Sequence, residues 1–140
     1  MKEAHIINLP KILDERGNLS FFQNEQHIPF TIQRVYWIYD VPGGEKRGGH
    51  AYREMQEFII ALSGSFDVVL FDGKEEKKIT LNRSYYGLYV PKMVWRSMEN
   101  FSTNALAFVA SDALYNEQDY IREKDVFINE LNTTKNQNNH

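Results

Sequence analysis

Four side chains suited to proton transfer or metal binding stand at fixed intervals in two short stretches of the sequence. His50, Tyr52 and Glu57 lie close together in the first stretch, and Arg96 lies in the second. A neutral imidazole can take a proton, a tyrosine hydroxyl can relay one, and a guanidinium can stabilise an oxyanion as it develops. His50, Tyr52 and Arg96 together suit the movement of a proton beside a carbonyl group, as in an isomerisation or epimerisation, whereas Glu57 is at the position of a metal ligand.

The intervals in the two stretches resemble the two cupin sequence motifs. The residues at the positions of the first motif are Gly44, His50, Tyr52, Glu57 and Gly64, and those of the second are Pro91, Met93, Arg96 and Asn100. In metal-binding cupins, two histidines and a glutamate of the first motif and one histidine of the second hold the ion. Tyr52 and Arg96 replace two of these ligands, and a guanidinium has a fixed positive charge and no lone pair for a cation. We therefore expect a pocket without a metal and a reaction without a cofactor.

Length and composition indicate one compact domain. The chain has 140 residues, of which 42% are hydrophobic and 14% aromatic, and this size is typical of a single domain. We expect one domain over residues 1–131 and a polar, disordered tail over residues 132–140. The formal net charge of −3, without a basic run, gives no indication of a nucleic-acid partner. The sequence has no cysteine, signal-peptide pattern or apolar stretch of membrane-spanning length, so we expect a cytoplasmic protein without a membrane partner.

Short β-branched and aromatic runs separated by turn residues predict strands along most of the chain. The predicted strands cover residues 5–9, 19–22, 32–39, 57–62, 65–71, 77–81, 86–90 and 105–110. Hairpin turns are predicted at residues 14–18, where the first two strands meet, and at residues 72–74. The fold class that we predict is all-β, a cupin-type antiparallel jelly-roll barrel with a short C-terminal helix.

Two candidate residues of the N-terminal half have both structural and functional interpretations. On the strand 32–39, Arg34 and Tyr36 share one face and Trp37 lies on the other. If the first face lines the barrel, Tyr36 points into the pocket; otherwise it is a core residue with a satisfied hydroxyl. Arg16, in the first predicted turn, is either a solvated turn residue, which is the more common case, or a functional one.

The segment 117–131 is predicted to be the C-terminal helix. Its apolar stripe recurs at intervals of three and four residues and consists of Tyr120, Ile121, Lys124, Phe127, Ile128 and Leu131. We expect this stripe to pack on the outside of the barrel or on a partner.

Several further stretches resemble one family of metal-free cupins, the bacterial TDP-4-keto-6-deoxy-D-glucose 3,4-ketoisomerases. They are DERGNL (14–19), IPF (28–30), QRVY (33–36), RGGH (47–50), GLYV (87–90), VWR (94–96), ASD (110–112) and DYIR (119–122). The similarity covers nearly the whole chain apart from the tail. It implies a homodimer whose subunits exchange N-terminal strands, and a product that an aminotransferase converts to a 3-amino-3,6-dideoxy sugar of surface glycans such as lipopolysaccharide.

The resemblance also implies roles for individual residues. His50 is the main proton carrier, and Tyr52 stands where the family usually has a second histidine. Because an unperturbed tyrosine has a pKa near ~10, His50 takes the larger role. His50 would remove the C3 proton of the sugar to give an enediol, while Arg16 and Arg96 hold the negative oxygen. The remaining candidates are Tyr36 in the catalytic set and Arg34, Arg47 and Arg122 on the diphosphate.

Two other functions and the product configuration stay open at this level. The first alternative is a non-enzymatic nucleotide-sugar-binding cupin, and the second is a nucleotide-sugar epimerase, which would be expected to use a histidine–aspartate pair and a longer chain. Galacto-forming members of the family tend to have arginine at position 16 and histidine at position 96, whereas gluco-forming members tend to have tyrosine and arginine. This chain has Arg16 and Arg96, and the Arg16–Gly17 pair favours the galacto epimer.

Overall fold

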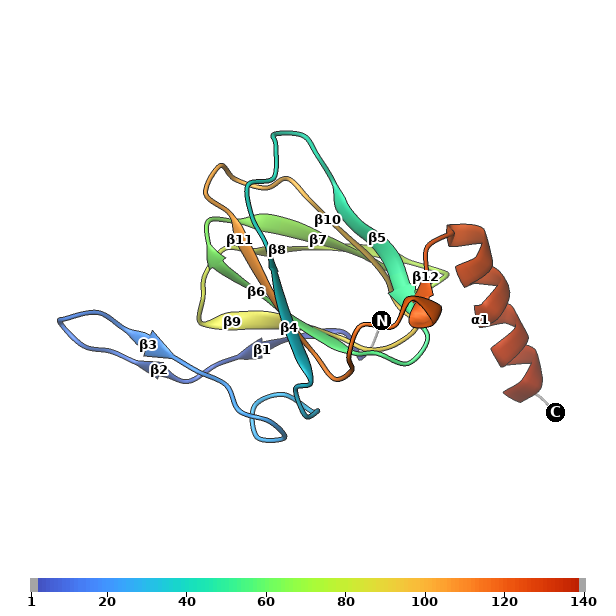
Figure 1. Cartoon of the computed structure of the whole chain (residues 1–140), viewed down its shortest axis with the longest axis horizontal. Helices are drawn as coiled ribbons and strands as arrows, with labels where there is room; N and C mark the ends of the chain where they lie inside the picture. The colour runs from blue at the N-terminus through green and yellow to red at the C-terminus, as the bar shows by residue number, and fades with distance from the viewer. Residues whose placement is uncertain (1–2, 139–140) are drawn as a thin grey trace.

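The computed structural model describes residues 3–138, which fold into two antiparallel five-stranded sheets with a helix at the C-terminal end (Figure 1). The first sheet has the order β1 (His5–Asn8), β9 (Tyr86–Val90), β6 (Glu57–Ser63), β11 (Leu106–Ser111), β4 (Arg34–Ile38). The second has the order β12 (Tyr120–Ile121), β5 (Arg47–Tyr52), β10 (Trp95–Glu99), β7 (Phe66–Phe71), β8 (Glu76–Leu81). The predicted cupin-type jelly roll with a C-terminal helix is confirmed.

The main apolar core lies between the two sheets. Its members come from strands of both layers and include Ile59, Phe66, Leu70, Leu88 and Met98, all of which are almost completely buried. β6 and β7 are buried along nearly their whole length, which explains why they read as continuous apolar runs rather than as an alternating pattern. This core is the rigid support for the polar side chains at one end of the barrel.

Two strands that carry the motif residues were not among the strands predicted from sequence pattern. β5 contains Gly48 and Gly49, and β10 mixes Trp95 with polar residues, so neither has the alternation that identifies a strand. They pair with each other, and Arg96 lies directly opposite His50 in the register. The cupin spacing, rather than the periodicity, indicates that these two stretches face one another.

The predicted N-terminal hairpin has its turn in the expected place but different arms. Gly17 has a φ of 125°, and the turn is closed by a hydrogen bond from its N–H to the carbonyl of Asp14 at 3.0 Å. The arms are β2 (Lys11–Ile12) and β3 (Leu19–Ser20), whereas β1 pairs with β9 of the barrel. Pro10 separates β1 from β2, and the β2–β3 hairpin extends away from the barrel (Figure 1).

The C-terminal helix is displaced from its predicted position. The structure has a short 3₁₀ turn, η1 (Glu117–Asp119), then β12, and only then the helix α1 (Lys124–Asn138). Tyr120 and Ile121 pair with β5 instead of joining the helix, while Phe127 packs against the barrel with Ile128 and Leu131 beside it. The predicted disordered tail is helical through Asn138, because residues 124–138 contain neither glycine nor proline to end the helix; residues 139 and 140 lie outside the described part. None of the helices in residues 3–138 is both long and apolar enough to cross a membrane.

Candidate active site

A cavity of about 300 Å³ opens at one end of the barrel, between β4 of the first sheet and β5, β10 and β12 of the second. Seven of the eight predicted site residues line it: Arg34, Tyr36, Arg47, His50, Tyr52, Arg96 and Arg122. On β4, Val35 and Trp37 alternate with them and are more exposed, as the strand periodicity predicts, and Trp37 also borders the cavity. Tyr36 therefore lies in the cavity wall, with its hydroxyl bonded to Glu57 and Arg96, and its catalytic role stays a prediction.

His50 is placed in the wall by its pairing with β10 and is held by aromatic neighbours. Its ring centroid lies 4.8 Å from that of Tyr52, in an edge-to-face contact, and 5.0 Å from that of Tyr120, in a tilted contact. The side chain is buried, and its Nε2 atom has no hydrogen-bond partner among residues 3–138. Burial and the nearby positive charges of Arg96 and Arg122 lower the pKa of His50 to about 2. The imidazole is therefore neutral at physiological pH, with a nitrogen free to take a proton.

Arg96 is completely buried and forms an ion pair with Glu57. Its Nε donates to Oε1 of Glu57 at 2.8 Å, and its Nη2 donates to Oε2 at 3.0 Å. Nη2 also donates to the hydroxyl of Tyr36 at 2.6 Å, and Nη1 donates weakly to the carbonyl of Gly48 at 3.3 Å. A Cβ atom at Gly48 would lie 2.2 Å from Nη1, and Gly48 has a φ of 74°. The glycine is thus required for the guanidinium to fit.

Two of the three tyrosines that line the cavity give their hydroxyl protons to the same carboxylate. Tyr36 donates to Oε2 of Glu57 at 2.5 Å, and Tyr52 donates to the same atom at 3.2 Å. Burial and the negative charge of Glu57 raise the pKa of both hydroxyls, although Arg96 opposes this effect. Neither tyrosine is a phenolate near neutral pH, so neither can act as a base there.

Three further arginines make the mouth of the cavity strongly positive. The guanidinium of Arg34 lies 4.8 Å from the ring of Tyr36, and its buried Nη1 has no hydrogen-bond partner within the described chain. Arg122 stacks on Tyr120 at 4.3 Å and forms a paired contact with Glu117, from Nε to Oε1 at 2.6 Å and from Nη2 to Oε2 at 2.8 Å. Arg47 completes the group. Such a cluster suits a diphosphate.

Arg16 is the one predicted site residue that the fold does not bring to this cavity. It lies at the tip of the β2–β3 hairpin, where its side chain is 89% exposed and pairs with Asp14 at 2.8 Å. Within a single chain, Arg16 is therefore a solvated turn residue. Any role in catalysis requires that the hairpin reach another copy of the protein.

Sequence reasoning missed two contributors to the site. The periodicity places Tyr120 in a helical stripe, although Tyr120 itself belongs to the DYIR stretch that carries the resemblance. Glu57 was read only as a remnant of a metal site, whereas it is the acceptor for Arg96 and two tyrosines. Residues 3–138 contain no group of three or more histidine, cysteine, aspartate or glutamate side chains that could hold a metal ion.

Comparison with known proteins places this chain in a family. Residues 2–132 match the family described as FdtA: WxcM-like, C-terminal. The chain belongs to this family. One relative, a TDP-4-oxo-6-deoxy-alpha-D-glucose-3,4-oxoisomerase from Aneurinibacillus thermoaerophilus, is 42% identical over 125 residues, which cover 89% of this chain and 90% of the relative.

Solved structures of similar proteins agree with the family assignment. A 3,4-ketoisomerase from Helicobacter canadensis is 41% identical, with a TM-score of 0.90 over 93% of this chain and 98% of the other. A histidine-to-asparagine variant of the 3,4-ketoisomerase QdtA from Thermoanaerobacterium thermosaccharolyticum, in complex with TDP-4-keto-6-deoxyglucose, is 35% identical, with a TM-score of 0.91 over 93% and 94% of the two chains. The predicted family is thereby confirmed.

Proposed function

We propose that the protein is a sugar 3,4-ketoisomerase that converts TDP-4-keto-6-deoxy-D-glucose to a TDP-3-keto-6-deoxyhexose through an enediol. The observation that carries this proposal is the unpartnered Nε2 of His50, which lies buried in the wall of an arginine-rich cavity. A neutral base beside positive groups suits removal of a proton next to a carbonyl, because the negative oxygen that results is stabilised. The names of the relatives point to the same reaction.

The reaction moves two hydrogens and needs no oxidant. His50 takes the proton from C3 of the sugar, and the electrons of the C3–H bond form the C3–C4 double bond as the C4 carbonyl oxygen becomes negative. This oxygen gains a proton while the C3 hydroxyl loses one. Return of the proton from His50 to C4 then leaves a ketone at C3 and a hydroxyl at C4, so substrate and product are isomers.

Arg96 has one N–H left for the oxygen that becomes negative. Of its five N–H groups, Nε uses one and Nη2 uses two in contacts with Glu57 and Tyr36. Nη1 uses one on the carbonyl of Gly48. The other N–H of Nη1 is the donor that we assign to the sugar oxygen.

The product that we propose has the galacto configuration. Tyr36 and Tyr52 both donate to Glu57, so His50 is the group in this set that can carry the proton both ways. In a gluco-configured substrate, removal of the C3 proton and delivery to C4 on the same ring face leave the C4 hydroxyl axial, as in galactose. The C3 ketone of this product is the group that an aminotransferase needs to make a 3-amino-3,6-dideoxy sugar.

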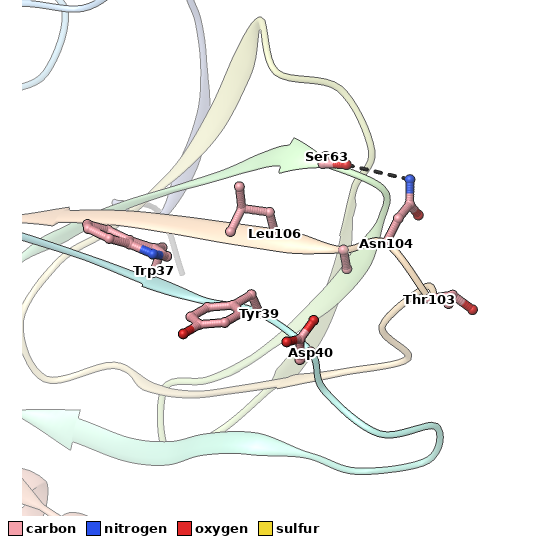
Figure 2. A pocket seen from close by; sticks show the side chains of 8 residues that line it. Trp37, Tyr39, Asp40, Ser63, Thr103, Asn104 and Leu106 are labelled. Atoms are coloured by element: carbon pink, nitrogen blue, oxygen red, sulfur yellow. Dashed lines mark hydrogen bonds between the residues drawn. The ribbon is translucent and has the colours of Figure 1, made fainter.

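We also propose a homodimer, in which the β2–β3 hairpin of one subunit covers the other. β1 is already paired within its own barrel, so β2 and β3 are the N-terminal strands that remain for exchange. The hairpin exposes Leu13 to 71%. β4, the last strand of its sheet, exposes Trp37 to 55%, and Tyr39, just after β4, is 62% exposed. Figure 2 shows these two aromatic side chains beside Leu106 of β11, where they line a surface hollow of about 360 Å³. An edge strand with exposed apolar side chains is a pairing surface.

Incubation with TDP-4-keto-6-deoxyglucose in deuterated water tests the proposed reaction. We expect a 3-keto product, identified as the galacto epimer by NMR. Its C4 carries the hydrogen removed from C3, or deuterium in the molecules for which the proton on His50 exchanges with the solvent before it returns. Deuterium at C5 instead would identify an epimerase. Tight binding of TDP without product or exchange would identify a nucleotide-sugar-binding protein, and an exclusively gluco product would contradict delivery of the proton on one face.

A further inference from the structure

Glu57 is a buried carboxylate with more hydrogen-bond donors around it than any other side chain of the site. Glu57 is 1% exposed. Its two carboxylate oxygens accept hydrogen bonds from two nitrogens of Arg96 and from the hydroxyls of Tyr36 and Tyr52. It does not line the cavity; the side chains that it binds do. Glu57 therefore acts on a bound sugar through other residues.

The orientation of Arg96 depends on this carboxylate. The paired contact at 2.8 and 3.0 Å fixes the plane of the guanidinium, because a carboxylate and a guanidinium match as two parallel hydrogen bonds. Once that edge is fixed, Nη1 must point toward Gly48 and the cavity. The direction of the free N–H is thus set from behind by Glu57.

The same carboxylate determines what the two tyrosines can do. Tyr36 and Tyr52 each have one hydroxyl proton, and each gives it to Oε2 of Glu57. While these bonds hold, the tyrosines present oxygen lone pairs rather than a proton to the cavity. Proton delivery to the sugar is left to His50.

We infer that Glu57 is a positioning residue that aims Arg96 at the reacting oxygen and withholds the protons of Tyr36 and Tyr52 from the sugar. This inference rests on the proposed ketoisomerase function. Glu57 stands at the position of a metal ligand in the first cupin motif. In this protein it pairs with the guanidinium of Arg96, which supplies the positive charge that a metal ion would otherwise supply. A glutamine cannot replace it, because its NH₂ group would face donors and the charge of Arg96 would be left buried without a partner.

The test is a comparison of Glu57→Gln, Glu57→Asp and the native protein. Glu99→Gln is the matched control, since Glu99 is a partly buried carboxylate that pairs with Lys46 and Lys78, away from the cavity. We measure kcat and KM, the affinity for TDP, the configuration at C4 of the product, and the NMR signal of the Arg96 Nε–H.

We expect Glu57→Gln to lower kcat by about 100-fold, the typical effect of losing one oxyanion donor. KM and TDP affinity should stay within about threefold, because the arginines assigned to the diphosphate do not contact Glu57. The Arg96 Nε–H signal should shift, and some product of the other C4 configuration should form as the tyrosine protons are released. Glu57→Asp keeps the charge but is shorter, so its kcat should be intermediate; it also provides the test if the glutamine variant does not fold.

Three results would overturn the inference. They are a kcat within about twofold of native in both variants, a loss of TDP affinity as large as the loss of kcat, and an unchanged Arg96 signal. Failure of the proposed function is seen separately, because the native protein and Glu99→Gln would then show no turnover of the sugar nucleotide.

Discussion

His50 combines a buried Nε2 atom that has no hydrogen-bond partner among residues 3–138 with surroundings that oppose its protonation. Burial comes first, and the positive charges of Arg96 and Arg122 add to it. A bound diphosphate would bring negative charge beside Arg122 and so raise the pKa of His50 toward a value at which it can hold a proton. Substrate binding itself would then make the histidine a stronger base.

The first prediction concerns the proton carrier. His50→Asn should lower kcat by about 100- to 10,000-fold, the usual contribution of a general acid or base, while TDP binding survives. Tyr52→Phe should have a smaller effect, because Glu57 keeps its contacts with Arg96 and Tyr36. Steady-state kinetics and calorimetric titration with TDP measure both effects. Near-native turnover in His50→Asn would remove His50 from the mechanism.

The second prediction concerns pH. Because the pKa of His50 is lowered from 6.5 to about 2, the free protein keeps its base neutral, and kcat/KM should show no acid limb from this residue between about pH 5 and 8. An acid limb with a midpoint near pH ~6.5, the ordinary value for histidine, would contradict this. The NMR titration of the imidazole provides an independent measurement.

The same shift has a consequence for stability. In the unfolded chain His50 binds a proton near pH ~6.5, whereas in the folded chain it does not, so protons favour the unfolded state below that pH. The contribution of neutral His50 to the free energy of unfolding is fully present above the pKa of the unfolded chain. It is lost progressively as the pH falls toward about 2, the pKa of His50 in the folded chain. Between pH 7 and pH 5, the free energy of unfolding measured with urea should therefore fall more for the native protein than for His50→Asn.

At the scale of elements, Arg53 joins three segments that position the cavity. Its side chain forms an ion pair with Glu130 of α1 at 2.8 Å. Its Nη1 donates to the carbonyl oxygens of Gln118 in η1, at 2.6 Å, and of Tyr120 in β12, at 3.0 Å. Tyr120 in turn contacts His50 and carries Arg122 against its ring. The helix thus supports the wall of the site from outside the barrel.

The third prediction follows from this arrangement. Arg53→Ala should raise KM several-fold more than it changes kcat, because β12 keeps its pairing with β5 but loses its link to α1, while Arg96 and Glu57 keep their contacts. Lys78→Ala is the control, since Lys78 forms an exposed pair with Glu99 at 3.1 Å and lies on β8, at the opposite edge of the sheet from β12. Kinetics of the two variants measure the difference. Equal KM values for Arg53→Ala and the control variant would show that α1 does not position the site.

The sequence predicted the elements where periodicity or spacing was strong. The predicted strand 86–90 has the same bounds as β9, and the inward face of β4 follows from the alternation of its residues. The helix was placed too early, because Tyr120 and Ile121 fit a helical stripe equally well, and only the pairing with β5 decides against it. Likewise, motif spacing could find Glu57 and Arg96, but their ion pair depends on the approach of β6 to β10 in three dimensions.

At the scale of the whole molecule, the β2–β3 hairpin is the feature that a single chain does not explain. Its strands have two residues each, and an isolated two-stranded ribbon is marginal in water. Ile12, Leu13 and Leu19 are exposed on it. Sequence could place Arg16 in a turn, but the direction of that turn depends on contacts beyond the chain's own barrel.

The last prediction tests whether Arg16 acts on the partner subunit. If hairpins are exchanged, a dimer of one Arg16→Ala chain and one His50→Asn chain has one complete site, in which the first chain supplies His50 and the second supplies Arg16. Each variant alone should have low activity, and an equal mixture, unfolded and refolded together, should recover about a quarter of native activity, because half of the dimers are mixed and each has one working site. A mixture without recovery would show that Arg16 does not act across the dimer. Sedimentation that shows a monomer at micromolar concentration would rule out the exchanged dimer altogether.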